Sequence, residues 1–400
     1  MAAEKNNKTL NVPNLRFPEF SGEWEKVHLS RIVTRVTRKN KNNESRLPLT
    51  ISAQYGLVDQ ISFFNKVVAS SDMSNYYLLH KGEFAYNKSY SGDYPWGAIK
   101  RLDRYDKGAL SSLYICFTPT DIIDSDFLVH YFESPKWHRE VSNIAGEGAR
   151  NHGLLNIAVP DFFNTQHCIA VNKAEQRKIA DFLNLINERI ETQKKVIEKY
   201  ESLIRGISNK LLYESEGASV RLGNILIERS ERTKIINQHE VLSSTVKGIF
   251  SQREYFSKDI ASENNVGYKI IRLHDVVLSP QNLWMGNINY NDKYEIGIVS
   301  PSYKIFSIAD GYDKRFVAGL LKTHRALYNY MQVSEQGASI VRRNLNMEAF
   351  EQLVFKMPPL CKQQEIGNAI SVLNSRLVVA TKIKFHLELQ KEWLLREMFI

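Results

Sequence analysis

An internal duplication constrains this chain more than any other feature of its sequence. Residues 49 to about 215 recur, degraded but in the same order, as residues 241 to 400. Each copy ends in a long segment with a heptad pattern of apolar residues. A chain that duplicates both a globular part and a helix is expected to fold as a pseudo-symmetric molecule. The duplication therefore argues against an enzyme built around a single pocket.

Matched residues keep a nearly constant spacing along the chain. The spacing is 192 positions between residues 77–86 and residues 269–278, and 189 positions between Gly97 and Gly286. It is 187 positions in the helical segments that end the two copies. The step from 192 to 189 indicates a three-residue deletion in the second copy. Chance similarity does not hold register over 160 residues, so we interpret the pattern as a true repeat.

The composition is that of a globular protein with room for two cores. The 400 residues are 43% hydrophobic and 24% charged, which excludes a disordered chain. Cys116, Cys168 and Cys361 have no CxxC or Cys/His metal spacing, so we expect a reducing cytoplasm, no zinc site and no disulfide framework. No apolar run approaches the roughly 20 residues of a membrane helix, which predicts a soluble, cytoplasmic protein with no membrane partner. The net charge of +9 favours an acidic partner such as nucleic acid.

Heptad patterns predict two coiled-coil helices, in residues 173–215 and 359–400. In the first segment apolar residues recur by fours and threes, and Gln193 interrupts the series. Gln193 matches Ala380 in the repeat alignment, and one polar seam residue commonly fixes the register of paired helices. We therefore expect the two helices to pair with each other; the alternative is two amphipathic helices on separate cores. The predicted helix-pairing seam comprises Ile179, Leu183, Ile186, Ile190, Gln193, Ile197, Ile204, Ile366, Ile370, Leu373, Leu377, Leu387 and Leu394.

The other faces of these helices are polar and mixed in charge, as solvated faces are. Some apolar residues nevertheless lie off the seam, and they favour a partner that covers a second strip of the helices. These residues include Phe182, Val196, Leu203, Phe385 and Leu395.

The globular parts are predicted to have a mixed α/β (α+β) fold. Each begins with a short helix-like segment, at residues 27–36 and at residues 220–229. Short β-rich runs punctuated by Gly, Asn, Asp and Ser follow in each copy. Helices are then expected at about residues 126–134 and 314–330.

Three motifs mark the ends of the duplicated parts. The amino terminus contains Leu15-Arg16-Phe17-Pro18-Glu19-Phe20 followed by Gly22-Glu23-Trp24. The first helix begins with Glu175-Gln176-Arg177-Lys178-Ile179, and the second with Pro358-Pro359-Leu360 and Gln363-Gln364-Glu365-Ile366. In this duplicated order the motifs resemble those of the specificity subunit of type I restriction-modification systems, over nearly the whole chain. Residues 169–173 depart from the family, which usually has a proline-containing lead-in there.

The resemblance implies a division into five parts. Two pseudo-repeated target-recognition domains would be joined by two long antiparallel coiled-coil helices. The parts are an N-terminal tail (residues 1–22), a first target-recognition domain (23–172), a central coiled-coil helix (173–215), a second target-recognition domain (216–358) and a C-terminal coiled-coil helix (359–400).

The resemblance also implies a function. In that family each recognition domain reads one half of a bipartite double-stranded DNA target. The helices set the spacing between the halves and bind two methyltransferase (modification) subunits, which restriction/translocase subunits join. Adenine methylation or restriction is then carried out by these partners. This chain would bind no cofactor itself, and S-adenosylmethionine, ATP and Mg are expected on the partner subunits.

Candidate DNA-binding residues lie in two polar loops of each copy. Base readout requires polar or basic side chains on loops, and phosphate contacts require cations or backbone donors. A solvated polar turn is the alternative for each residue. The candidates are Asn87, Lys88, Ser89 and Tyr90 with Arg150 and Asn151 in the first copy, and Gln281, Asn282 and Trp284 with Arg342 and Arg343 in the second.

Catalytic motifs are absent from the sequence. There is no methyltransferase Asn/Asp-Pro-Pro-Tyr/Phe element, no GxxxxGK[ST] phosphate loop and no HExxH. Asp121 with Asp124, and Asp310 with Asp313, could hold the metal of a nuclease, but no lysine partner is evident. We therefore expect a non-catalytic subunit. A coiled-coil scaffold for protein interactions is the main alternative, and a self-sufficient nuclease is a third.

Overall fold

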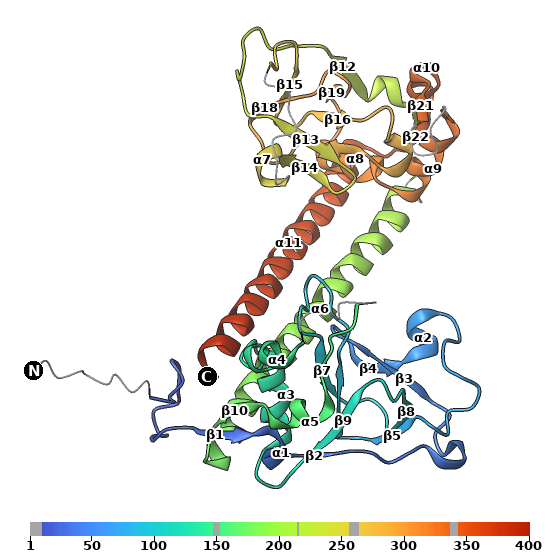
Figure 1. Ribbon diagram of the computed structural model, residues 1–400. Coiled ribbons are helices and arrows are strands. Elements are labelled where there is room, and N and C mark those ends of the chain that lie inside the picture. The colour runs from blue at the N-terminus through green and yellow to red at the C-terminus, as the bar shows by residue number, and fades with distance from the viewer. Residues whose placement is uncertain (1–9, 147–152, 214–215, 256–263, 337–342) are drawn as a thin grey trace, which may run out of the picture. The chain divides into compact units, whose positions relative to one another are not determined.

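The computed structural model describes residues 10–146, 153–213, 216–255, 264–336 and 343–400. The chain forms two compact units, each containing one globular domain and a part of each long helix (Figure 1). Unit 1 comprises Met1–Thr192 and Ile383–Ile400, and unit 2 comprises Gln193–Lys382. The described helices include none with the length and apolar character that crossing a membrane requires.

Unit 1 is built on two four-stranded sheets. The first has the strand order β2-β9-β6-β7 and is antiparallel throughout; the second has the order β4-β3-β8-β5, with β3 and β8 parallel. The strands of the first sheet are β2 (Val33–Arg35), β9 (Ile115–Pro119), β6 (Phe84–Asn87) and β7 (Ala98–Arg101). Those of the second are β4 (Gly56–Asp59), β3 (Pro48–Ser52), β8 (Lys107–Leu110) and β5 (Tyr77–His80).

Helices and one further strand pair complete the domain of unit 1. Strand β1 (Glu25–His28) pairs antiparallel with β10 (Gln166–Ile169), which leads into the long helix. The helices are α1 (Leu29–Ile32), α2 (Gln60–Phe64), α3 (Ser125–Glu133), α4 (His138–Ile144) and α5 (Val159–Asn164). Aromatic side chains of β6, β9, α3 and α5 fill the core beneath the first sheet, where Phe84 stacks on Phe117 with ring centroids 5.5 Å apart.

Unit 2 repeats this topology. Its four-stranded sheet has the order β12-β19-β16-β17, and β11 pairs with β22 as β1 pairs with β10. These strands are β12 (Leu226–Arg229), β19 (Lys304–Ile308), β16 (Val276–Leu278), β17 (Ile288–Tyr290), β11 (Ala218–Arg221) and β22 (Val354–Met357). The counterpart of the second sheet is two pairs, β13 (Leu242–Thr245) with β14 (Gly248–Ser251), and β15 (Lys269–Arg272) with β18 (Ile296–Val299).

The remaining elements of unit 2 follow the same order along the chain. The helices are α7 (Gln252–Tyr255), α8 (Lys314–Leu321), α9 (His324–Gln332) and α10 (Met347–Glu351). A short hairpin pairs β20 (Ser334–Gln336) with β21 (Arg343–Leu345). The mixed fold and the internal repeat predicted from the sequence are thus confirmed.

The predicted opening helices are largely wrong. Residues 27–36 fold as the end of β1, the four-residue helix α1 and then β2, and residues 220–229 fold as strand, 3₁₀ turn and strand. The sequence periodicity of these short segments reflects only the helical turn in their middle. The flanking residues become strands because they find partners about 80 to 140 positions away, such as Val27 with His167 and Ile227 with Ser307. The predicted helix at 314–330 is two helices, because Thr323 caps a new one.

Two matched glycines, each packed against a leucine, show how similar the two domains are. Gly108 lies so near Leu49 that an added Cβ would stand 2.3 Å from its side chain, and Gly297 lies 2.4 Å by the same measure from Leu242. Gly108 and Gly297 are matched residues of β8 and β18. Each domain therefore requires a residue without a side chain where this leucine crosses the strand.

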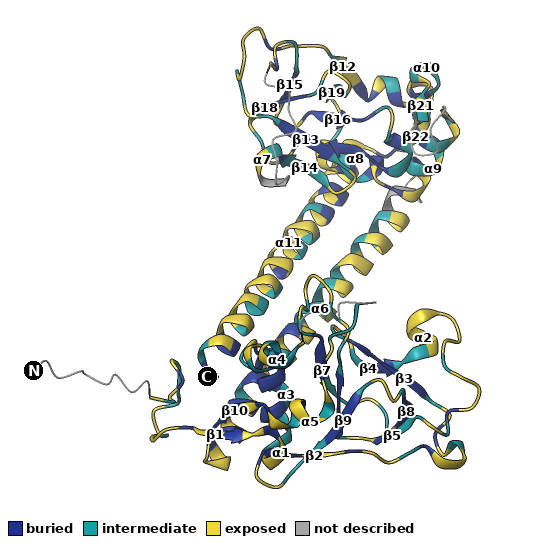
Figure 2. Ribbon diagram, in the orientation of Figure 1, coloured by how far each residue is buried: buried dark blue, intermediate teal, exposed yellow. Residues whose placement is uncertain are grey.

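The long helices α6 (Lys173–Tyr213) and α11 (Leu360–Glu397) pair antiparallel, as predicted. In unit 1 the first half of α6 packs in one core with the end of α11, through residues such as Leu183 and Leu394. In unit 2 the core that contains Ile366 and Ile370 is joined by Ile207 of α6. Figure 2 shows exposed residues along the outer faces of both helices. The predicted seam residues are all buried or half-buried.

Some off-seam residues are covered by the chain itself. Phe182 meets Phe17 edge-to-face with centroids 5.8 Å apart, and Leu395 is buried in the core of unit 1. By contrast, Leu203 and Phe385 are exposed. The second apolar strip is therefore narrower than the sequence suggested.

The motifs that mark the ends of the duplicated parts attach the starts of the long helices to the domains. Arg16 forms an ion pair with the buried carboxylate of Glu175 at 2.7 Å, and the indole of Trp24 donates to the same carboxylate at 3.2 Å. Gln176 accepts a hydrogen bond from the backbone N–H of Asp124 at 2.7 Å, and Gln363 accepts one from that of Asp313 at 3.0 Å. Each helix start is thus fastened to its own domain by the same glutamine contact.

Candidate nucleic-acid interface

In unit 1 the predicted loop of residues 87–90 lies against residues 153–155. Strand β6 ends at Asn87, whose side-chain oxygen accepts a hydrogen bond from the N–H of Ser89 at 3.0 Å and turns the chain. Ser89 then forms an antiparallel bridge with Leu154. The N–H of Tyr90 donates to the carbonyl of Gly153 at 3.1 Å. The segment that follows Arg150 and Asn151 is therefore held against the loop of residues 87–90.

Unit 2 also brings its two loops together, through a different backbone hydrogen bond. The backbone N–H of Arg343 donates to the carbonyl of Gln281 at 3.1 Å. The guanidinium of Arg343 lies over the ring of Trp284, 4.7 Å from the centroid, where a cation is attracted by the face of the indole. The 3₁₀ turn Leu283–Met285 presents Trp284, and Gly286 closes the turn in the left-handed conformation.

The two contacts are equivalent in the repeat. Gln281 stands 192 positions after Ser89, and Arg343 stands 189 positions after Leu154. Matched residues therefore lie against each other in both units, but the bonds differ: Ser89 and Leu154 face each other between bonds made by their neighbours, whereas Gln281 and Arg343 are joined directly. We name these the two-loop surfaces: residues 87–90 with 153–155 in unit 1, and residues 281–284 with Arg343 in unit 2.

Side-chain exposure differs among the predicted residues. Ser89 and Gln281 are exposed, while Asn87, Tyr90, Asn282, Trp284 and Arg343 are partly exposed. The ammonium of Lys88 is directed back to the carbonyl of Ile157 at 3.4 Å, which makes it a support of the loop as well as a surface cation. Arg150, Asn151 and Arg342 lie outside the described residues.

A lysine that the sequence did not single out supports the loop of unit 2. Lys322 at the end of α8 donates to the carbonyl of Gly286 at 2.8 Å, just after Trp284. Lys322 is exposed as a residue, but partial desolvation of its ammonium beside this loop holds its pKa below the usual lysine range. The sequence could have indicated Lys322 by its position between two helices, directly after α8 and two residues before α9 begins. The bridging role of Leu154 could have been found from its 189-position match with Arg343.

Two of the four aspartates considered for a nuclease, Asp124 and Asp313, cap helices. Asp124 accepts hydrogen bonds from the N–H groups of Asp126 and Phe127 and caps α3, and Asp313 caps α8 in the same way. Among the residues that the structure describes, no group of three or more His, Cys, Asp or Glu is placed to hold a metal ion. Cys116 and Cys168 are buried, and Cys361 is exposed.

Similarity to known proteins is found at the level of structure. No protein-family model matches the sequence, and no curated protein matches it. The S subunit of a type I restriction-modification system from M. genitalium superposes with a TM-score of 0.58 at 15% identity, over 97% of this chain and 99% of that one. A chain from a structure of the type I R-M system that addresses complex assembly and conformational transition gives 0.53 at 13% identity, over 94% and 97%. The resemblance seen in the sequence motifs thus extends to the whole architecture, and the chain has the fold of a type I restriction-modification S subunit.

Proposed function

We propose that the chain is the specificity subunit of a type I restriction-modification complex and that it reads a bipartite double-stranded DNA target. The observation that carries the proposal is the repeated two-loop surface. Matched positions of the two loops are in contact in both units, Ser89 with Leu154 in one and Gln281 with Arg343 in the other. Matched positions that stay adjacent while their side chains differ are what reading two different half-sites requires.

The side chains of unit 2 suit base edges in the major groove. Arginine pairs well with guanine, and Gln or Asn with adenine, because each pair forms two parallel hydrogen bonds. Gln281, Asn282 and Arg343 are all at least partly exposed. The net charge of +9 adds the general attraction to phosphates on which DNA binding depends.

Partner subunits complete the activity in this proposal. Exposed apolar residues lie along α11 and would be covered by two modification subunits. They are Val372, Val378 and Val379 in unit 2 and Ile383, Phe385, Leu389 and Trp393 in unit 1. Restriction/translocase subunits would join the same complex. Because the sequence contains no catalytic motif, S-adenosylmethionine, ATP and Mg are assigned to the partners and the protein to the cytoplasm, where the DNA is.

The test is to co-express the chain with a matching modification subunit and to map adenine methylation across a genome by long-read sequencing. We expect a split motif with two defined halves around an unspecified spacer. Gln281→Ala with Arg343→Ala should relax one half, and Asn87→Ala with Ser89→Ala should relax the other. A stable complex that produces no new methylation, or variants that leave both halves unchanged, would contradict the proposal.

The role of the helices has its own test. Seven residues inserted into both α6 and α11, beside Gln193 and Ala380, preserve the heptad register and add about 10 Å to each helix. Since stacked base pairs rise 3.4 Å, the spacer in the methylated motif should grow by about three base pairs while both halves stay the same. Insertion into α6 alone is the control, and it should abolish methylation because the helix pair loses its register.

A further inference from the structure

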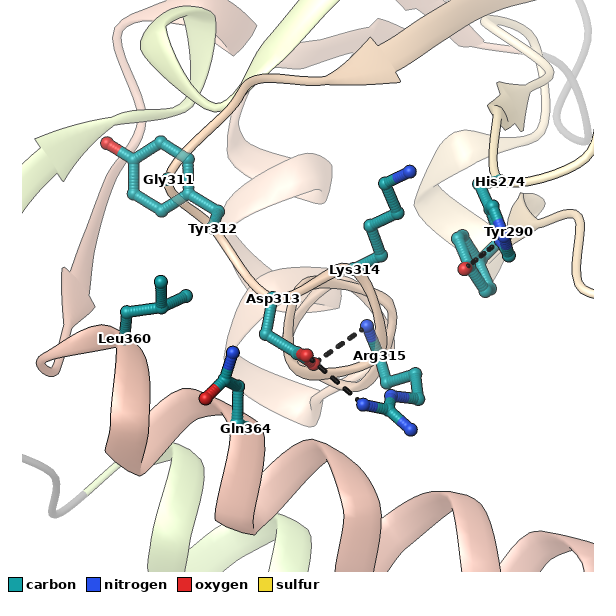
Figure 3. Close-up of a pocket in the computed structure, with 9 residues that line it drawn as sticks. All are labelled: His274, Tyr290, Gly311, Tyr312, Asp313, Lys314, Arg315, Leu360 and Gln364. Atoms are coloured by element: carbon teal, nitrogen blue, oxygen red, sulfur yellow. Dashed lines mark hydrogen bonds and ion pairs between the residues drawn. The ribbon is translucent and has the colours of Figure 1, made fainter.

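Unit 2 contains a pocket of about 450 Å³ whose lining includes none of the residues of its two-loop surface. It is lined by His274 and Tyr290, by the start of α8, and by Leu360 and Gln364 at the start of α11 (Figure 3). Figure 3 shows Lys314 extending from α8 on the side of the pocket where the rings of His274 and Tyr290 lie. A concave site of this size with a few polar groups is suited to a small ligand or to one group of a larger ligand.

The matching region of unit 1 contains ion pairs between arginines and aspartates. Arg101 binds Asp103 and Asp126, each at 2.6 Å, and Arg177 lies 3.7 Å from Asp124. In the repeat alignment Tyr290 stands for Arg101, and Gln364 stands for Arg177. Unit 2 therefore lacks both of the arginines that neutralise the aspartates of unit 1.

The start of α8 in unit 2 carries positive charges where the matched helix of unit 1 has none. Ser125 and Asp126 of unit 1 correspond to Lys314 and Arg315. Arg315 lies 3.4 Å from Asp313, whose carboxylate already caps α8, and Lys314 is exposed with no acidic partner among the described residues. Because Asp313 occupies the first N–H groups of α8, a ligand in this pocket would be held by side chains and not by the helix terminus.

His274, which lines the pocket, has an unusual backbone conformation. Its backbone has φ = 75°, in the left-handed region that glycine favours, and the matched residue of unit 1 is Gly82 with φ = 89°. A histidine in this conformation carries a backbone cost that glycine would not, so His274→Gly is a substitution that the backbone favours. The Tyr290 hydroxyl lies 2.5 Å from Nδ1, and the two rings stack at 5.7 Å, which orients the imidazole and leaves Nε2 for another partner.

We propose that this pocket of unit 2 binds a phosphate group, with Lys314, Arg315 and His274 as its partners. Lys314 and Arg315 supply charged N–H donors, which form the strongest hydrogen bonds to phosphate oxygens. The phosphate comes from a DNA backbone or from a free phosphorylated molecule. The DNA source rests on the function proposed above, whereas the pocket itself does not.

The first measurement is the titration of the full-length chain with inorganic phosphate at constant ionic strength, followed by calorimetry. We expect saturable binding that Lys314→Ala weakens on the order of tenfold, since one charged hydrogen bond is lost. His274→Gly should weaken binding too while leaving the Tm equal or higher, because glycine suits this backbone; a loss of affinity then does not reflect unfolding. Lys234→Ala, which removes an exposed lysine of the same unit, is the charge-matched control and should bind as the parent chain does.

The second measurement identifies the source of the phosphate. Lys314→Ala is compared with the parent chain in binding to duplexes of several sequences over a range of salt. A uniform loss of affinity with a smaller salt dependence assigns the pocket to the DNA backbone. Phosphate binding that is lost in the variant while DNA binding is unchanged assigns it to a free phosphorylated molecule. Absence of saturable phosphate binding, or equal binding by the parent chain, Lys314→Ala and His274→Gly, overturns the proposal and leaves the DNA specificity reading untouched.

Discussion

Gln193 and Ala380 occupy matching positions in the two copies, and Nε2 of Gln193 donates a hydrogen bond to the carbonyl oxygen of Ala380 at 3.1 Å. In an antiparallel pair of repeated helices, the point where matched residues meet is the midpoint of the pairing. Gln193 and Ala380 mark that point. The polar residue predicted to fix the register thus lies where the register of the helix pair is defined.

Replacement of Gln193 tests the cost of this contact. Gln193→Leu should raise the free energy of unfolding by about 0.5–1 kcal/mol, because the half-buried seam position becomes apolar. Gln193→Glu should lower it, because a carboxylate cannot donate to the Ala380 carbonyl. Urea denaturation of both variants measures the effects, with the exposed Glu188→Gln as control. Destabilisation by the leucine would mean that the hydrogen bond outweighs the apolar gain.

The end of α11 anchors unit 1. Phe399 is 1% exposed and packs against Trp24, Phe127 and Tyr131, with centroids 5.2–6.3 Å apart. Phe399→Ala should therefore destabilise unit 1 by about 3–5 kcal/mol, measured by hydrogen exchange of the α3 amides. Trp393→Ala, at a side chain that is 49% exposed, should change stability by less than about 0.5 kcal/mol. Equal effects of the two substitutions would contradict the anchoring role.

The matched glycines predict matched costs. Gly108→Ala and Gly297→Ala each place a methyl group against a leucine and should destabilise their own unit by about 1–3 kcal/mol. Gly206 in α6 has no neighbour near its added Cβ, so Gly206→Ala should stabilise the chain by about 0.5–1 kcal/mol. Hydrogen exchange resolved by unit distinguishes the three variants, and a Gly108→Ala effect in unit 2 would count against independent cores.

Acid should weaken unit 1 through a buried histidine. His167 lies between the hydroxyls of Tyr131 at 2.8 Å and Thr165 at 2.7 Å, and burial lowers its pKa from 6.5 to about 4. The unfolded chain takes up this proton at higher pH than the folded chain does, so stability is complete above pH 6.5 and falls as the pH drops towards 4. Urea denaturation across this range should show the fall, and His167→Gln should flatten it.

A carboxylate of the same unit acts at lower pH. Burial would raise the pKa of Glu133, but the hydrogen bond with His130 and the charges of Lys391 and Lys100 outweigh it and hold that pKa below its usual 4.5. Its contribution to stability is therefore present above pH 4.5 and is lost only as the pH falls further. If the free energy of unfolding of His167→Gln still fell between pH 6.5 and 4 as it does in the parent chain, a group other than His167 would be responsible for the fall.

Arg343 should contribute to one half-site only. Arg343→Ala is expected to weaken binding to a cognate duplex by about 1–3 kcal/mol and to relax preference at one position, since a bidentate contact to a base would be lost. Leu154→Ala at the matched place in unit 1 carries no such donor and should leave base preference at the other half nearly unchanged. Fluorescence anisotropy against duplexes with single base changes measures both effects.

Features that extend over many residues, such as the repeat and the heptad seam, could be predicted from the sequence, whereas strands of four residues could not. The repeat and the heptad seam depend on many residues in register, so one exception such as Gln193 does not obscure them. The strands at residues 25–28 and 218–221 escaped prediction because their partners lie about 140 positions away and their own patterns are too short. The polar loops were recognised by composition, but their pairing through Ser89 with Leu154 and Gln281 with Arg343 depends on backbone hydrogen bonds that no side-chain pattern encodes.

Residues 14 and 15 contact the end of α11 in unit 1, where the N–H of Leu15 donates to the carbonyl of Glu397 at 2.9 Å and the side-chain amide of Asn14 donates to the Glu397 carboxylate. At the matched place in unit 2, residues 214–217 join the end of α6 covalently to β11. The residues before β1 therefore reach the end of α11 through hydrogen bonds in unit 1, whereas in unit 2 the corresponding connection is the chain itself. A short peptide across the termini and a cut near residue 215 would exchange the roles of the two copies, and a circularly permuted chain of this kind should keep every contact described for both units.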